Sequence, residues 1–328
     1  MKNLFHISIL VLLCALPLQV ASSQNIKVYE SLGSFEGDIN TALANATQLL
    51  EGAGMNVLSS FEAGQATECS FGARVISFVD PSMVDQLITL DAKTAPYSIV
   101  DRVVLYSDEQ GGHIAFVNPQ SIYRTVFQDK KEAWDLAGEH RNRVRALFGT
   151  TDSHQYGQKR DKGLINRTMG VMAGGPFEGK IETLYTIPNA TLASVASRIE
   201  QNFNSGEGKW ELEASYRYDL NSIDATIFGI AGREMEAKSF SIVGAGSDSA
   251  RDDFECPGTA YAAAYPLEII ALQVGTDVEI QLVSAMFRMK MYFEDAGKWA
   301  FMKNMGMPGS LTSEIKDRIE RATANAGN

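Results

Sequence analysis

Six methionines in the last part of the chain are the first residues whose type and spacing suggest chemistry. They form two groups with the same spacing, M-x-x-M-x-M, and make up six of the chain's 12 methionines: Met286, Met289 and Met291, then Met302, Met305 and Met307. Thioether sulfur is a ligand for soft metal ions such as Cu(I). Methionine also fills irregular gaps in a hydrophobic core, so two interpretations are open.

The surroundings of the two groups differ. The segment "FRMKMYF" around the first group alternates like a β-strand, which would place Met289 and Met291 on one face beside two phenylalanines. We expect that face to pack in the core. The second group lies in "FMKNMGMPGS", whose glycines and proline predict a turn or loop where the sulfurs of Met302, Met305 and Met307 could converge. A periplasmic Cu(I) site there is one alternative function.

Motifs for other chemistries are missing from the sequence. Asp152, Ser153 and His154 are adjacent in "TDSHQYG", whereas a catalytic triad converges from separate parts of a rigid scaffold. The four histidines form none of the usual zinc-binding spacings. In "SFSIVGAGSDSARDDFEC", acidic residues follow the G-x-G and would repel a phosphate. We therefore predict no cofactor and lean against an enzyme.

The charge balance limits the partners. The 328 residues include 40 acidic and 29 basic residues, for a formal net charge of −11. Such a chain repels phosphate backbones, and the sequence has no basic stripe that would offset this. Nucleic acid is therefore not expected as a partner. After the N-terminal segment, no apolar run approaches the roughly 18 residues of a membrane span.

Residues 1–23 have the pattern of a cleaved export signal. Lys2 precedes the apolar run "LFHISILVLLCALPL", and "ASSQ" supplies small residues for cleavage. We expect a soluble periplasmic or secreted protein. In an oxidising compartment Cys69 and Cys256 could form a disulfide between distant parts of the chain. Alternatively, both could remain buried thiols.

The order of predicted elements occurs twice, at residues 26–148 and 180–325, with a Gly-rich, polar connector at 149–179 between them. Each half begins with a strand, an amphipathic helix and further strands, among which we count "SFSIVGAG" in the second half. A β-hairpin follows in both halves. Next comes a predicted strand with an aromatic–Arg pair, Tyr123-Arg124 in "SIYRTVF" and Phe287-Arg288 in "FRMKMYF". These matches predict an internal duplication.

The first hairpin carries a family resemblance. The segment "APYSIVDRVVLYSDEQGGHIAFVNP", residues 95–119, resembles the core signature of the bacterial domain-of-unknown-function 302 family. The resemblance covers residues 27–148 best and implies a small α+β sandwich that is often dimeric. Where family members commonly carry Cys-Asn-Pro, this chain has Val79-Asp80-Pro81, and the second half lacks the Asn-Pro. The family has no settled activity to carry over.

We therefore predict an α+β protein made of two tandem sandwiches, each with a mainly antiparallel sheet and helices on one face. The expected function is non-enzymatic binding of a small molecule or protein, with a homodimer as a further option. The alternative is an enzyme with an unrecognised site at the hairpin and sheet face. Its expected ligand-binding residues are Asp101, Arg102, Tyr106, Arg124 and Arg288, because guanidinium groups bind oxyanions bidentately.

Overall fold

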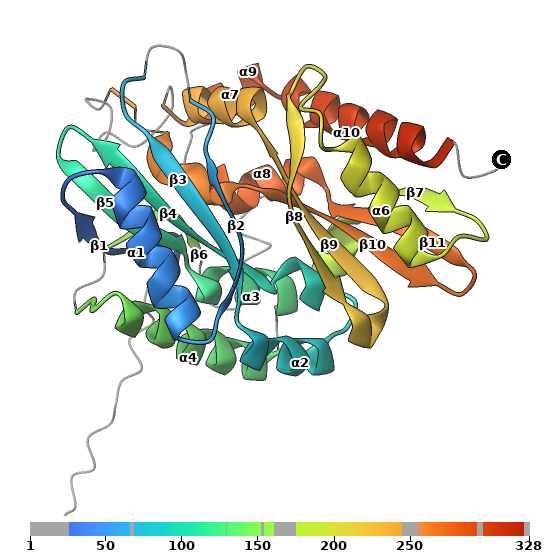
Figure 1. Ribbon diagram of the computed structural model, residues 1–328, viewed down its shortest axis with the longest axis horizontal. Helices are drawn as coiled ribbons and strands as arrows, with labels where there is room; N and C mark the ends of the chain where they lie inside the picture. Colours follow the sequence, from blue (N-terminus) through green and yellow to red (C-terminus); the bar gives the residue numbers. More distant parts are fainter. Residues whose placement is uncertain are drawn as a thin grey trace, which may run out of the picture.

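The structure is a computed structural model that describes residues 26–65, 69–128, 130–151, 154–160, 175–244, 255–256, 258–293 and 298–324. The expected export signal at residues 1–23 lies outside these ranges. Two sheets lie side by side, the first formed by the blue-to-green half of the chain and the second by the yellow-to-red half (Figure 1). Within the described ranges, no helix has the length and apolar character needed to cross a membrane.

The first half contains a six-stranded antiparallel sheet in the order β2-β3-β4-β5-β1-β6. Its elements are β1 (Ile26–Phe35), α1 (Ile39–Gly52), β2 (Asn56–Glu62), β3 (Ala73–Val79), α2 (Pro81–Leu90), η1 (Ala95–Tyr97), β4 (Val100–Asp108), β5 (Gly111–Val117), α3 (Pro119–Phe127), α4 (Lys131–Leu147) and β6 (Gln155–Arg160). Strand β6 falls inside the predicted connector, so part of that segment extends the first sheet instead of forming a loop.

The second half contains a five-stranded antiparallel sheet in the order β7-β11-β10-β9-β8. Its elements are η3 (Phe177–Lys180), β7 (Ile181–Ile187), α6 (Leu192–Asn202), β8 (Leu212–Leu220), η4 (Asn221–Ile223), β9 (Ala225–Gly232), α7 (Arg233–Gly244), η5 (Thr259–Ala264), β10 (Leu267–Val274), β11 (Asp277–Val283), α8 (Ala285–Phe293), α9 (Lys298–Lys303) and α10 (Gly306–Ala324). Helices α6 and α10 pack together beside this sheet (Figure 1).

The two sheets have the same layout. Read from β2, the first sheet has the order β2-β3-β4-β5-β1, and read from β8, the second has the order β8-β9-β10-β11-β7. When the strands are numbered within their own half, both orders are second, third, fourth, fifth, first. Strand β6 is an addition to the first sheet, next to β1. The predicted α+β class with two antiparallel sheets is confirmed, while a common ancestry of the halves stays a prediction.

Local sequence signals explain where several helices begin. The side chains of Asp38, Asp80 and Asn118 accept hydrogen bonds from main-chain N–H groups in the first turns of α1, α2 and α3. Pro81 and Pro119 occupy the first helical position, where the missing N–H has no cost. The Asn-Pro of the family-like motif is therefore a helix start, with the cap and the proline side by side.

Three segments that we predicted as strands are helical. "SIYRTVF" lies in α3, "FRMKMYF" lies in α8, and "SFSIVG" forms the end of α7. Apolar runs this short are compatible with a buried strand or a buried helix, because periodicity cannot separate the two over seven residues. "FMKNMGMPGS" is also not a loop as a whole, since it spans the end of α9 and the start of α10.

The halves share one hydrophobic core. One face of the first sheet packs against α1 in a smaller cluster that includes Leu50, Phe78 and Phe116. The other face belongs to a larger cluster that continues into the second half. There Tyr29 stacks on Tyr156 and meets the edge of Tyr261, in both cases with ring centroids 5.2 Å apart. Apolar burial of this kind favours docking of the halves over their separation.

Two further contacts join the halves at loops. Cys69 and Cys256 are linked by a disulfide, with their Cα atoms 5.7 Å apart. The buried carboxylate of Glu236 accepts hydrogen bonds from the N–H of Gly232 at 2.9 Å and from the N–H of Gly64, in the first half, at 2.6 Å. Gly64 packs tightly, because an added Cβ would lie 2.1 Å from the carbonyl oxygen of Arg233.

We predict that Gly64→Ala destabilises the protein by about 1–3 kcal/mol, because the added methyl group must push α7 away from the loop. Gly52→Ala is the matched control: its added Cβ has no neighbour within 4 Å, and alanine favours a helix by up to about 1 kcal/mol. Urea denaturation of both variants measures the difference. Equal stabilities would show that the contact between Gly64 and α7 does not hold the halves together.

Candidate functional site

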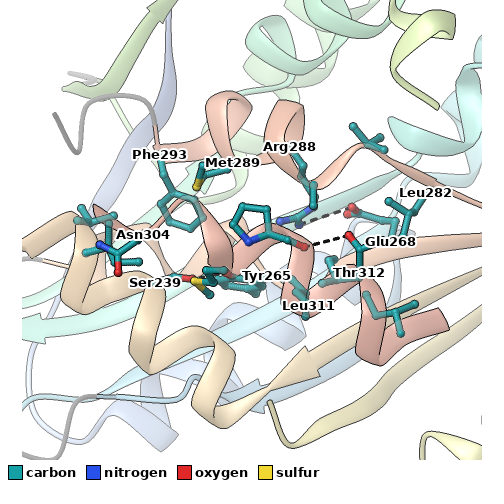
Figure 2. Close-up of a pocket in the computed structure, with 18 residues that line it drawn as sticks. Ser239, Tyr265, Glu268, Leu282, Arg288, Met289, Phe293, Asn304, Leu311 and Thr312 are labelled. Carbon is teal, nitrogen blue, oxygen red and sulfur yellow. Dashed lines mark hydrogen bonds and ion pairs between the residues drawn. The ribbon is translucent and has the colours of Figure 1, made fainter. Parts of the chain in front are cut away.

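A pocket of about 70 Å³ lies in the second half, between α7, β10, β11, α8 and α10. Most of its wall is apolar, with contributions from Ile242, Leu282, Met289, Phe293 and Leu311. Arg288 and Glu268 lie together on one side of the pocket, whereas Phe293 and Asn304 lie on the other side (Figure 2). The pocket therefore has apolar walls and one charged end.

Arg288 comes from α8 and is held mainly by the main chain. Its Nη2 donates hydrogen bonds to the carbonyl oxygens of Ala264 and, at 3.0 Å, Pro266. Its distance to the Glu268 carboxylate is 3.7 Å, which is an ion pair but too long for a hydrogen bond. The guanidinium also lies over the rings of Tyr265 and Tyr292, 5.5 and 4.8 Å from their centroids. These contacts fix its position beside the pocket.

Arg102 reaches the same carboxylate from β4 of the first half. It is buried and donates hydrogen bonds to the Glu268 carboxylate, to the Pro266 carbonyl at 3.0 Å and to the Tyr292 hydroxyl at 2.5 Å. Burial alone would lower the pKa of Arg102, but the Glu268 carboxylate raises it above its usual value. Two guanidinium groups from different halves thus share one carboxylate at the end of the pocket.

The structure brings together only two of the five residues expected to bind a ligand, Arg102 and Arg288. Asp101 is next to Arg102 on β4, and neighbouring residues on a strand point to opposite faces. Asp101 accordingly contacts His140 on α4. Tyr106 stacks on His113, and Arg124 lies over Trp134, with centroid distances of 4.9 and 5.1 Å. These three residues do not line the pocket, and neither does Arg102, which reaches it only through Glu268.

The match between Tyr123-Arg124 and Phe287-Arg288 is out of register by two residues. Helices α3 and α8 each contain nine residues and each begin two residues after the last buried residue of the hairpin's second strand. Counting from these starts, the counterpart of Arg288 is Ile122, and that of Arg124 is Lys290. The aromatic–Arg pattern thus misled the comparison of the halves, because helix positions follow the capping residue and not the nearest similar pair.

The methionines divide between the pocket and the surface. Met289 and Met307 line the pocket, whereas Met302 and Met305 are exposed, by 56% and 46%. Met291 is buried in the core, as we expected for the first group. On a helix, however, Met289 and Met291 point in different directions. A Cu(I) site at Met302, Met305 and Met307 stays a prediction.

The first half contains a buried charge cluster around His140. The histidine Nε2 lies 2.7 Å from Asp101, and its Nδ1 lies 3.3 Å from Asp80, which also pairs with Arg143 at 2.8 Å. Burial alone would lower the pKa of His140, but Asp101 and Asp80 outweigh it and raise the pKa to about 9. Against its own burial, His140, Ser82 and Arg143 lower the pKa of Asp80 to about 2. The cluster joins α2, β4 and α4.

Sequence reasoning missed the residues that hold these clusters. We considered His140 only as a zinc ligand, yet its side chain is fully buried among charged groups. The available signal was its place in the inward stripe of α4, where Ala133, Ala137 and Val144 follow helical spacing on both sides of it. Glu268 gave no such signal, because it becomes a site residue only where the other half packs against it.

Comparisons with known proteins give a limited result. No family model matches the chain, and no curated protein matches it. Part of the chain is similar to the crystal structure of the uncharacterized conserved protein DUF302 from Bacillus stearothermophilus, with 13% identity and a TM-score of 0.33. The match covers 38% of this chain and 98% of that protein. A TM-score of 0.33 does not establish a shared fold, and membership of that family stays a prediction.

Stability is predicted to fall as the pH rises from about 5 to 9. Burial raises the pKa of Glu236 to about 7, and the cluster raises that of His140 to about 9, so both groups bind protons more tightly in the folded state. The stabilising effect of each proton is complete below the ordinary pKa of its group, which is 4.5 for Glu236 and 6.5 for His140. It is lost by about pH 7 for Glu236 and by about pH 9 for His140.

Each contribution is on the order of 3 kcal/mol. Urea denaturation between pH 5 and 9 measures the total. Glu236→Gln is expected to flatten the profile below pH 7, and His140→Gln above pH 6.5. A wild-type free energy of unfolding that stays constant or rises over this range would contradict the prediction.

Proposed function

We propose that the protein is a non-enzymatic binding protein that holds a small, mainly apolar molecule in the pocket beside α8. The observation that carries the proposal is the pocket itself, with apolar walls from five elements and a charged end at Arg288 and Glu268. Ligand sites in proteins typically combine a concave apolar lining with a few fixed polar groups. The polar groups fix the orientation of the ligand, and the apolar walls supply most of its affinity.

The volume limits the size of the ligand. An engineered cavity of roughly 150 Å³ in another protein accepts benzene. The pocket here, at about 70 Å³, has about half that volume. We therefore expect a short aliphatic chain to occupy the pocket, with the remainder of any longer molecule outside it.

We further propose that the protein acts in the periplasm or outside the cell. The export-signal pattern of residues 1–23 supports this location. The disulfide between Cys69 and Cys256 also supports it, since such bonds persist in oxidising compartments. A binding protein in that compartment would capture a small molecule before its uptake or transfer.

Filling the pocket is predicted to weaken binding at least tenfold. Ala285 lines the pocket at the start of α8, so Ala285→Leu places three extra carbon atoms in or beside the cavity. Ala44→Leu makes the same change on the exposed face of α1 and serves as the control. Isothermal titration with 1-hexanol, hexanoate and hexylamine should show binding of at least one compound to the wild type and to Ala44→Leu. Affinity for Ala285→Leu should be at least tenfold lower.

The proposal fails if none of the three compounds binds the wild type at millimolar concentration. It also fails if Ala285→Leu binds as tightly as the control while retaining its fold. Circular dichroism and a thermal melt of each variant establish that retention, because overpacking alone can cost about 1–3 kcal/mol.

A further inference from the structure

The charged end of the pocket has more positive than negative groups. Arg102 and Arg288 contribute two positive charges, and Glu268 contributes one negative charge. Their side chains are only 3%, 11% and 10% exposed, respectively. Charges removed from water in this way are stable only when they are paired and hydrogen-bonded. The three groups together therefore leave one positive charge without a counter-charge among them.

That positive charge lies mainly on Arg288. Glu268 accepts a direct hydrogen bond from Arg102, whereas its distance to Arg288 is 3.7 Å. The carbonyl oxygens that accept hydrogen bonds from Arg288 carry no formal charge. Its Nε is buried and has no hydrogen-bond partner within the described part of the chain. Arg288 is also the guanidinium that lines the pocket.

A second buried donor nearby lacks a partner. The hydroxyl of Tyr216, on β8, is fully buried and forms no hydrogen bond to any described residue. Burial raises the pKa of Tyr216 well above its usual value, so this hydroxyl keeps its proton. Arg102, Arg288 and Glu268 all act on it electrostatically. Tyr216 does not line the pocket, so the positively charged donor at the pocket wall is Arg288.

We infer that the ligand of the pocket is a short-chain carboxylic acid, bound as its anion, with the carboxylate paired to Arg288 and the chain against the apolar wall. The inference rests on the proposed function, because it names the ligand class of the same pocket. An ammonium group in this place would lie beside the Arg288 guanidinium, and the Glu268 carboxylate that it would approach already accepts a hydrogen bond from Arg102. A neutral alcohol would leave the charge of Arg288 without a counter-ion.

The net charge of the whole chain does not oppose this assignment strongly. The formal charge of −11 is spread over 328 residues. Exposed charges are screened over about 8 Å at physiological ionic strength, whereas a buried group in contact with the ligand is screened much less. The local positive charge of Arg288 therefore determines which ligand charge is favoured inside the pocket.

Isothermal titration with three six-carbon probes tests the ligand class: hexanoate, 1-hexanol and hexylamine. We expect the wild type to bind hexanoate at least tenfold more tightly than the other two. Arg288→Gln should weaken hexanoate binding by about 10- to 100-fold, as for the loss of a charge-assisted hydrogen bond, and change 1-hexanol binding less than threefold. Arg288→Lys keeps the charge without the planar fork and should retain an intermediate affinity.

Arg124→Gln is the matched control, since Arg124 lies over Trp134 and does not line the pocket. It should bind all three probes like the wild type. Should Arg288→Gln fail to fold, the charge preference of the wild type and the result for Arg288→Lys still decide the question.

Equal binding of hexanoate and 1-hexanol, with no effect of the Arg288 variants, would overturn the carboxylate assignment and leave the apolar pocket as a binding site. Preferred binding of hexylamine would overturn it as well. Absence of binding by all three probes would instead remove the proposed function, and the assignment with it.

Discussion

The buried ion pair between Arg102 and Glu268 is the contact on which the arrangement of the halves and of the pocket depends. It joins β4 of the first sheet to β10 of the second. The two residues occupy matching positions. Each directly precedes the residue in the sixth pair counted from its hairpin turn, Val103 facing Phe116 and Ile269 facing Leu282. Matching positions with the same charge would repel each other in the core. Opposite charges at this position therefore require that the two halves differ in sequence.

A buried ion pair is not stabilising by itself, since removing two charges from water costs several kcal/mol for each ion. Here hydrogen bonds from Arg102 to Tyr292 and Pro266 offset part of that cost, and the guanidinium lies 5.1 Å from the centre of the Tyr292 ring. The pair specifies one way of docking the halves, while the shared aromatic core supplies the apolar burial. Because Glu268 accepts a hydrogen bond from Arg102, it neutralises the neighbouring Arg288, 3.7 Å away, less completely.

The prediction from sequence was most accurate where local signals and periodicity agreed. Helices α1 and α6 follow helical spacing and both hairpins follow alternation, and the structure contains them. Short apolar segments were misassigned, as in α3, α7 and α8, because a helix buried on several sides resembles a buried strand over seven residues. Of the site, the sequence grouped Arg102 with Arg288 but assigned Met307 to a separate metal-binding group.

The sequence by itself determined the α+β class, the repeated order of elements and the candidate cysteine pair, because these depend on spacing along the chain. Only the tertiary structure decided that Arg102 meets Glu268, that Asp101 turns away toward His140, and that α7, α8 and α10 enclose a pocket. These contacts join residues as far as 166 positions apart. No local pattern encodes them, since the ion pair depends on how the halves pack against each other. The other two depend on how distant elements pack within one half.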